Sequence, residues 1–262
     1  MFKIFIGYCE NAIKKLFMYR IFIISEIVNS LILPILLNFF LWKSIIKYNS
    51  IGYNLQEMML YIIVSNIILL FTQIHIEHNI EGDVKTYKLG QKLLLPLNYT
   101  LNLILNFVSD SIVRFIFIYL PLLIIILFIS PNAIVLERVL YLLPTIIVAF
   151  IINSLFSLII GFFSFWTTEI WGIAAVRNLI TGLLTGAVLP LDIFPKTIQD
   201  IMLYTPFPYI TYIPTKVLID NNFNIEIIKN GLFISTLWII TLTIFMLVLK
   251  NRGMKKYTSS GG

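Results

Sequence analysis

Two uninterrupted apolar runs, PLLIIILFI at residues 121–129 and TLTIFMLVL at residues 241–249, decide the fold of this chain. Neither run alternates apolar and polar residues, as a strand of a membrane barrel would over about 10 residues. A helix needs roughly 20 mainly apolar residues to cross the hydrocarbon core of a bilayer, and both runs lie inside longer apolar stretches. The runs therefore predict membrane-spanning helices.

The composition of the whole chain agrees with this prediction. Of the 262 residues, 59% are hydrophobic and 12% are charged, whereas a typical soluble domain has about 25% charged residues. Because the bilayer core holds no water, each apolar stretch must be helical or enclosed by protein. We predict one all-helical transmembrane domain over residues 1–262. Its six spans are Ile21–Lys43, Met58–Ile76, Leu101–Ile129, Val139–Phe165, Gly172–Leu191 and Gly231–Leu249.

The basic residues predict how these spans are oriented. Six spans place both termini and the second connector on one face, which carries 11 basic residues: Lys3, Lys14, Lys15, Arg20, Lys85, Lys88, Lys92, Lys250, Arg252, Lys255 and Lys256. The other face carries six: Lys43, Lys47, Arg138, Lys196, Lys216 and Lys229. The positive-inside bias predicts a multi-pass protein of the cytoplasmic membrane with both termini in the cytoplasm. Basic residues at membrane borders suit anionic lipid headgroups and argue against nucleic acid as a partner.

Residues 1–20 predict an amphipathic helix that lies in the membrane plane before the first span. On a helix Phe5, Cys9 and Leu16 share one face, whereas Glu10 and Lys14 lie elsewhere. Cys9 is the only cysteine, so an intramolecular disulfide is impossible.

The sequence contains no pattern that predicts catalysis. No G-x-x-x-x-G-K-[ST] occurs, so the chain has no P-loop with which to hydrolyse ATP. The only histidines, His75 and His78, have no further ligands at a recognised spacing, so we predict no metal site. No G-x-S-x-G occurs either. We predict a protein that is not an enzyme, with no catalytic residue and no cofactor of its own.

Four charged residues fall inside the predicted spans, all nearer to the cytoplasmic border: Glu26, Asp110, Arg114 and Arg177. Charged groups are costly in a membrane and are therefore candidate functional residues. Asp110 and Arg114 are spaced to pair along one helix face. Because none of the four lies at the midplane, they do not support a proton relay. We interpret them as an interfacial network that fixes helix packing, or alternatively as residues that transmit motion into the bundle.

Two connectors differ from ordinary loops. The cytoplasmic one, residues 77–99, mixes acids and bases, and Gly82–Asp83 and Gly90 predict several short pieces rather than one long helix. Its pattern fits docking into another protein's cleft as well as it fits a simple loop. The extracytoplasmic one, residues 190–230, holds five of the ten prolines, which forbid a full span. Its aromatic residues suit the headgroup level, so we expect short re-entrant helices between the fifth and sixth spans.

Two motifs in these connectors resemble those of the ABC-2 type transporter permease family. The first is G-x-x-x-P-L-D-x-F-P followed by L-P-F-x-Y-x-x-Y-x-P, with Thr205 in place of the leucine. Its residues here are Gly186, Pro190, Leu191, Asp192, Phe194, Pro195, Pro206, Phe207, Tyr209, Tyr212 and Pro214. The second motif follows the second span and comprises Gly82, Asp83, Tyr87, Leu95 and Pro96. The resemblance covers nearly the whole chain.

The resemblance implies roles for three groups of residues. A coupling segment that docks on an ATPase would use Glu77, Glu81, Gly82, Asp83, Tyr87 and Lys88. An extracytoplasmic gate would use Pro190, Leu191, Asp192, Phe194, Pro195, Pro206 and Phe207. A seam between two permeases would pass Gly182 and Gly186, where small residues permit close helix approach.

The resemblance also implies an exporter subunit powered by a separate machine. Two copies of an ABC ATPase, which use ATP and Mg²⁺, would pair with two permeases, and the second permease could be identical or dissimilar. The cavity would be largely apolar, which favours a lipid, a hydrophobic drug or antibiotic, or a peptide as cargo. The main alternative is a carrier or channel that needs no ATP. That alternative predicts coupling ions at the midplane, where this sequence has no charges.

Overall fold

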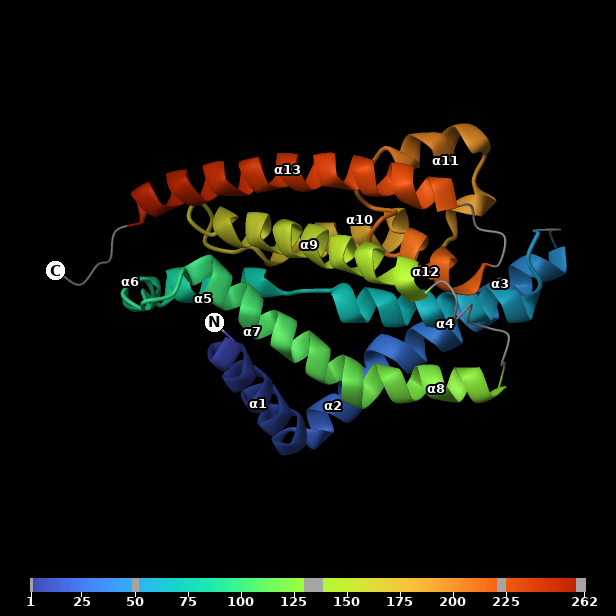
Figure 1. Cartoon of the computed structure of the whole chain (residues 1–262), viewed down its shortest axis with the longest axis horizontal. Coiled ribbons are helices and arrows are strands. Elements are labelled where there is room, and N and C mark those ends of the chain that lie inside the picture. Colours follow the sequence, from blue (N-terminus) through green and yellow to red (C-terminus); the bar gives the residue numbers. More distant parts are fainter. Residues whose placement is uncertain (1, 49–51, 130–138, 221–224, 258–262) are drawn as a thin grey trace.

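The computed structural model describes residues 2–48, 52–129, 139–220 and 225–257, and all regular structure in these ranges is helical (Figure 1). The N-terminal half contains α1 (Phe2–Met18), α2 (Arg20–Ile27), the π-helical η1 (Val28–Ile32), α3 (Leu33–Tyr48), α4 (Leu55–Thr72), α5 (Ile76–Lys85), α6 (Leu89–Leu93), α7 (Tyr99–Arg114), the π-helical η2 (Phe115–Tyr119) and α8 (Leu120–Ile129). The C-terminal half contains α9 (Val139–Phe163), α10 (Trp171–Leu184), the 3₁₀ turn η4 (Leu191–Ile193), α11 (Lys196–Leu203), α12 (Tyr212–Ile219) and α13 (Ile225–Lys256).

Five helical segments in the described ranges are long and apolar enough to cross a membrane. They are Ile23–Tyr48, Leu55–Lys85, Tyr99–Ile125, Leu140–Phe163 and Glu226–Lys256. These segments confirm the positions of five of the six predicted spans. The first and third are each assembled from two α-helices joined through a π-helical turn, η1 and η2 respectively.

The predicted fifth span, Gly172–Leu191, is wrong in length. Helix α10 has 14 residues, which rise about 21 Å and fall short of the roughly 30 Å of a hydrocarbon core. The chain leaves the helix after Thr185 and turns at Gly186, where φ is +78°. The carbonyl of Thr185 then accepts a hydrogen bond from the N–H of Tyr212 at 2.9 Å. The observed architecture is five candidate spans and one shorter apolar helix.

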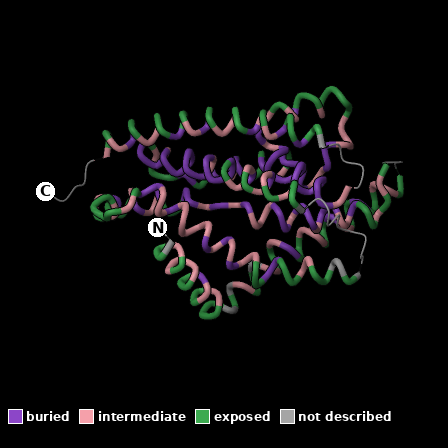
Figure 2. The backbone as a smooth tube through the Cα atoms, in the orientation of Figure 1, coloured by how far each residue is buried: buried purple, intermediate pink, exposed green. Residues whose placement is uncertain are grey.

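Helices α9 and α4 form the centre of the bundle, as the buried residues in Figure 2 show. In the most apolar part of Leu140–Phe163, 61% of the residues are buried, against 12% in Ile23–Tyr48. The peripheral helices therefore present apolar side chains outward, which suits lipid or another membrane subunit as their surroundings.

A stripe of small or polar residues at intervals of four explains why α9 is central. Ala149, Asn153, Ser157 and Gly161 are all buried on this helix. Such residues let helices approach closely and bond to each other where the hydrophobic effect gives no drive for association. At Gly161 a Cβ atom would lie 3.1 Å from the Cα atom of Glu77. The second span therefore crosses α9 almost in backbone contact.

The elements divide between the two ends of the bundle. Helices α5 and α6 and the C-terminal end of α13 lie at one end with α1 beside them, and α11 and the end of α3 lie at the other (Figure 1). Helix α1 packs along α7, and Tyr8 donates a hydrogen bond to Asn102. Residues 77–99 form short pieces as predicted, but Gly82 and Asp83 do not interrupt them. Helix α5 continues through both residues, and the chain turns at Tyr87 instead.

Candidate coupling and gate sites

The second span is broken inside the bundle, between α4 and α5. Gln73, the first residue after α4, has extended backbone angles, and helical structure resumes only at Ile76. The break leaves the first N–H groups of α5 without helical partners. The Ser157 hydroxyl accepts from the N–H groups of Ile76 (2.7 Å) and Glu77 (3.2 Å), and donates to the Glu77 carboxylate. A side chain of α9 therefore caps α5.

The carboxylate of Glu77 forms a buried ion pair with Arg177 of α10. Its Oε1 atom lies 3.3 Å from the guanidinium and 3.1 Å from Nδ1 of His75. Arg177 also donates a hydrogen bond to the carbonyl of Ile74 at 3.4 Å. Glu77 is 0% exposed and Arg177 is buried, so each charge depends on these partners. The cluster ties α5, α9 and α10 together.

Two further acidic residues of α5, Glu81 and Asp83, also form hydrogen bonds and ion pairs with other residues of the chain. Glu81 accepts from the N–H of Ile170 (3.2 Å) and pairs with Lys85 (2.8 Å). Asp83 is buried, where it accepts from the Tyr99 hydroxyl (2.8 Å) and pairs with Lys92 (2.7 Å). Asp83 thereby links α5 to the start of α7 and to α6.

The exposed part of the predicted coupling segment is the turn and short helix that follow α5. We call residues 86–96 the coupling tip. Tyr87 has φ +57°, the only positive φ at a non-glycine residue in the described ranges, and Lys88 is exposed beside it. Leu94 is 86% exposed, and Leu93 and Leu95 are also exposed. Of the six residues assigned to coupling, Tyr87 and Lys88 face outward, Gly82 and Glu81 are partly buried, and Glu77 and Asp83 are buried.

A second polar cluster at the opposite end of the bundle centres on Asp192. Its carboxylate accepts hydrogen bonds from Tyr53 and Tyr212 and lies 2.5 Å from the Lys216 ammonium. Lys216 also donates to the Tyr53 hydroxyl at 2.7 Å. Gln199 donates to the backbone carbonyl of Asp192 at 3.2 Å. This cluster joins the chain before α4 to α11 and α12.

The chemistry of the Asp192 cluster keeps each group in one protonation state. Burial, together with the hydrogen bond to Asp192, raises the pKa of the Tyr53 phenol to about 12, so the hydroxyl stays a donor. Burial opposes ionisation of Asp192, but hydrogen bonds from Lys216, Tyr212 and Tyr53 outweigh it and lower the pKa of the carboxyl. Burial likewise disfavours the charged lysine, but the bonds to Asp192 and Tyr53 raise the pKa of Lys216. The pair is therefore ionic at neutral pH.

Gly186 forms the corner from which the segment after α10 returns to the bundle. The hydroxyl of Tyr61 donates to the Gly186 carbonyl (2.6 Å), and Ser65 donates to the next carbonyl, that of Ala187 (2.8 Å). A Cβ atom at Gly186 would lie 2.9 Å from the Cβ atom of Tyr212 and 3.0 Å from a methyl of Leu191. The corner requires glycine for both its backbone angle and its space.

Gly186→Ala is expected to destabilise the protein by about 1–2 kcal/mol from the backbone conformation alone, with the close contacts adding to this loss. SDS-induced unfolding in mixed micelles would measure the change. Gly182→Ala is the matched control, because no atom lies within 4 Å of its Cβ position and helical glycine is less stable than alanine. Equal stability of the Gly186 variant and the wild type would contradict this account of the corner.

The other residues assigned to the gate surround this corner. Pro190, Leu191 and Pro206 are buried. Phe207 stacks on Phe156 of α9 with ring centroids 5.6 Å apart. Phe194 is partly exposed, and Pro195 is exposed at the start of α11. The assigned gate residues are thus brought together at the end of the bundle opposite the coupling tip, where most of them fasten the segment to the bundle.

The two glycines assigned to the seam between permeases lie in different surroundings. Gly186 is enclosed within this chain, as described above. Gly182 lies on α10, where nothing approaches its Cβ position within 4 Å. The same helix exposes large apolar side chains, among them Trp171, Leu179 and Leu183. The open surface of α10 therefore includes Gly182 but not Gly186.

Three of the four charges predicted inside spans have described side chains, and these three lie in two places. Arg177 binds Glu77 and His75, whereas Asp110 and Arg114 lie on α7 and line a cavity beside α1. The side chain of Glu26 lies outside the described residues. His75 provides the nearest link between the two groups, because it contacts Glu77 and also lines a second cavity with Asp110 and Arg114.

Several residues of both clusters were not identified from the sequence: Ser157, Tyr53, Lys92 and Lys216. Ser157 gives no signal of its own, because serine is common in membrane helices. Lys216 carries a signal, since a lysine amid YIPTKVLI needs an acidic partner if it is buried. The sequence offered Asp192 and Asp220 nearby, and the structure uses both, at 2.5 and 3.4 Å.

Comparison with known protein families gives a match over nearly the whole chain. A family model described as ABC-2 family transporter protein matches residues 9–261 of the chain. The matched residues include both the coupling tip and the segment around Asp192. A search of curated proteins finds no match.

Proposed function

Because this chain belongs to the ABC-2 family of transporter proteins, whose members of this kind are non-catalytic membrane subunits, we propose that it is the permease of an ATP-driven exporter. Family membership implies an ATPase partner in general. The complex that we propose contains two ATPase subunits, which use ATP and Mg²⁺, and two permeases, identical or dissimilar. Its cargo would be an amphipathic or hydrophobic molecule, such as a lipid, an antibiotic or a peptide.

The coupling tip is the observation that carries this proposal. It combines exposed leucines with Tyr87 and Lys88, and it projects from the end of the bundle at which α13 also ends (Figure 1). Exposed apolar side chains in such a group are characteristic of a protein interface. The tip is also anchored, because Asp83 connects it to α7 and Glu77 connects α5 to α9 and α10. A displacement of the tip by an ATPase would therefore reach three other helices.

Transport requires that the ATPase contact the permease differently in its two states, because a partner with equal affinity for both shifts no population.

The exposed apolar face of α10 supports the assignment of an amphipathic cargo. This face surrounds the open position at Gly182, so two copies could approach closely along it. We also propose that both termini are cytoplasmic, in agreement with the excess of basic residues on the face of the membrane that carries them.

Affinity purification of the tagged chain from its own cells tests the proposal. We expect a co-purifying chain that carries a P-loop, and cargo transport by the reconstituted complex that stops without ATP. Leu94→Glu is expected to lower ATPase recovery about tenfold, because loss of one central interface residue typically costs more than about 1 kcal/mol.

Ile201→Glu serves as the control, since Ile201 is an exposed apolar residue of α11 at the opposite end. It should leave ATPase recovery unchanged. Full-rate transport by the purified chain alone would refute the proposal. Equal ATPase recovery with Leu94→Glu would refute only the assignment of the tip.

A further inference from the structure

A cavity of about 160 Å³ lies where the second span is broken, and we call it the break cavity. Gln73 and His75 of its wall come from the break between α4 and α5. Ser30 comes from the π-helical η1 and Tyr119 from the π-helical η2. Three departures from regular α-helix therefore meet at one space. Turns of π-helix often mark functional sites.

Ser111 of α7 places the break cavity near the middle of the membrane, because it also lines the cavity. It lies 12 residues (111 − 99) after the start of the 27-residue candidate span Tyr99–Ile125. At 1.5 Å per residue, this is about 18 Å along a span of about 40 Å. Non-helical backbone at such a depth is tolerated only where protein encloses it or where it lines a water-filled space. Since residues of the break line a cavity, the second condition is the one that applies.

The wall of the break cavity has hydrogen-bonding capacity that the protein does not use. The side chains of Ser30, Gln73 and Ser111 form no hydrogen bond with another residue in the described part of the chain. The imidazole of His75 contacts Glu77 at 3.1 Å, yet 44% of the His75 side chain is exposed. Unpaired hydroxyl and amide groups are costly in an apolar space, and cavities that stay empty are lined by apolar groups. The volume suffices for about five water molecules.

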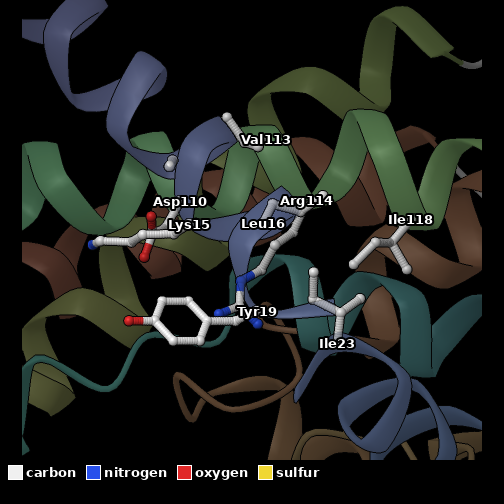
Figure 3. Close-up of a pocket in the computed structure, with 9 residues that line it drawn as sticks. Lys15, Leu16, Tyr19, Ile23, Asp110, Val113, Arg114 and Ile118 are labelled. Atoms are coloured by element: carbon white, nitrogen blue, oxygen red, sulfur yellow. The ribbon is translucent and has the colours of Figure 1, made fainter. Parts of the chain in front are cut away.

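A route from the surface of the protein to the break cavity begins where α1 and α2 meet α7. A cavity of about 150 Å³ lies there, and we call it the elbow cavity (Figure 3). Asp110 and Arg114 line both cavities, so the two spaces adjoin along α7. Lys15 and Tyr19, in the wall of the elbow cavity, are exposed. A lysine at such a position keeps its ammonium group in water, which places an aqueous phase at this rim.

We propose that the elbow and break cavities form one water-filled crevice, which enters the bundle between α1 and α2 and reaches the break in the second span. Its water forms hydrogen bonds with Ser30, Gln73 and Ser111 and contacts the exposed part of His75. Because His75 is a partner of the Glu77 carboxylate, the crevice connects the buried ion pair with the aqueous phase at the α1 side. The crevice requires no ATPase, so its test is independent of the proposed function.

The accessibility of single cysteines to silver ions tests the crevice. Cys9→Ala removes the only cysteine of the chain, and Ser111→Cys or Ser30→Cys then places one thiol in the wall. Silver ions are small and charged, and they bind thiolates, whose formation is suppressed in apolar surroundings. The thiol that silver has not blocked is measured by maleimide labelling after unfolding in SDS. Both thiols should be blocked at least about tenfold faster than that of Ser109→Cys.

Ser109→Cys is the matched control for these two variants. Ser109 lies on the same helix as Ser111, is 0% exposed and lines neither cavity. Its hydroxyl donates to the carbonyl of Leu105 within α7. A thiol at this position should therefore stay protected from silver in the folded protein.

Sealed vesicles of uniform orientation test where the crevice opens. Lys3→Cys on α1 and Lys196→Cys on α11, each in the Cys9→Ala chain, mark the two ends of the bundle, because both lysines are exposed. Silver added on the side at which Lys3→Cys reacts should block Ser111→Cys. Silver present only on the side at which Lys196→Cys reacts should leave Ser111→Cys free.

Each contrary result overturns the proposal in a defined way. Equal rates for Ser111→Cys, Ser30→Cys and Ser109→Cys would show that the break cavity contains no accessible water. Reaction of only one of the two wall positions would contradict a crevice that they share, because they lie on different helices. Reaction of Ser111→Cys from the Lys196 side would place the opening at the opposite end of the bundle and exclude the route through the elbow cavity.

Discussion

Arg177→Ala is expected to destabilise the protein by about 3–5 kcal/mol, the largest effect of any single substitution that we predict. The substitution would leave the carboxylate of Glu77 buried without its charged partner, close to Ser157 and His75. Uncompensated buried charge, rather than loss of the attraction itself, accounts for most of this cost. SDS-induced unfolding in mixed micelles measures it directly.

A double-mutant cycle separates pairing from general damage to α10. Glu77→Ala combined with Arg177→Ala should be less destabilising than the sum of the two single variants, with a coupling energy of about 1–3 kcal/mol. Arg252→Ala removes an exposed arginine near the end of α13 and should change stability by less than about 0.5 kcal/mol. Additivity of the two single variants would show that the ion pair contributes nothing.

Lys216→Met should loosen the segment of residues 185–220 at a cost of about 1–3 kcal/mol. Methionine keeps much of the volume of lysine but removes the ammonium that binds Asp192 at 2.5 Å and Tyr53 at 2.7 Å. Because Asp192 is partly exposed, water compensates some of the loss, and the effect should be smaller than at Arg177. Hydrogen–deuterium exchange should show faster exchange across α11 and α12 with little change in α4.

Lys196→Met is the matched control for this prediction. Lys196 is exposed at the start of α11 in the same segment, and it should leave the exchange rates unchanged. Uniformly faster exchange over the whole bundle with Lys216→Met would mean that the lysine stabilises the fold in general. That result would contradict a local role of Lys216 in holding residues 185–220 against the bundle.

The sequence predicts the spans because each depends on a local property, the length of an apolar run. PLLIIILFI and TLTIFMLVL lie in α8 and α13 without any need for tertiary information. The shortness of α10 depends instead on partners far along the chain. Tyr61 holds the carbonyl of Gly186 from 125 residues away, and no local pattern reveals such a contact.

The candidate site was predictable only as a set of segments. The sequence singles out the two connectors, but it does not reveal that acids of α5 are buried, because an acidic residue of an amphipathic segment is normally expected to face water. Glu77 instead meets Ser157, 80 residues away, and Asp83 meets Tyr99. The residues that remain exposed for a partner are the leucines of the tip, such as Leu94, together with Tyr87 and Lys88. The leucines become recognisable only once the acids are seen to be bonded within the protein.

The three non-helical residues between α4 and α5 affect how a mechanical load would travel through the molecule. A helix transmits compression along its axis only while its ladder of hydrogen bonds is continuous. At Gln73–His75 this ladder is interrupted, so no continuous row of helical hydrogen bonds connects α5 to α4. If a partner displaced the coupling tip, the force would pass from α5 through Ser157 and Arg177 into α9 and α10 rather than along the second span into α4.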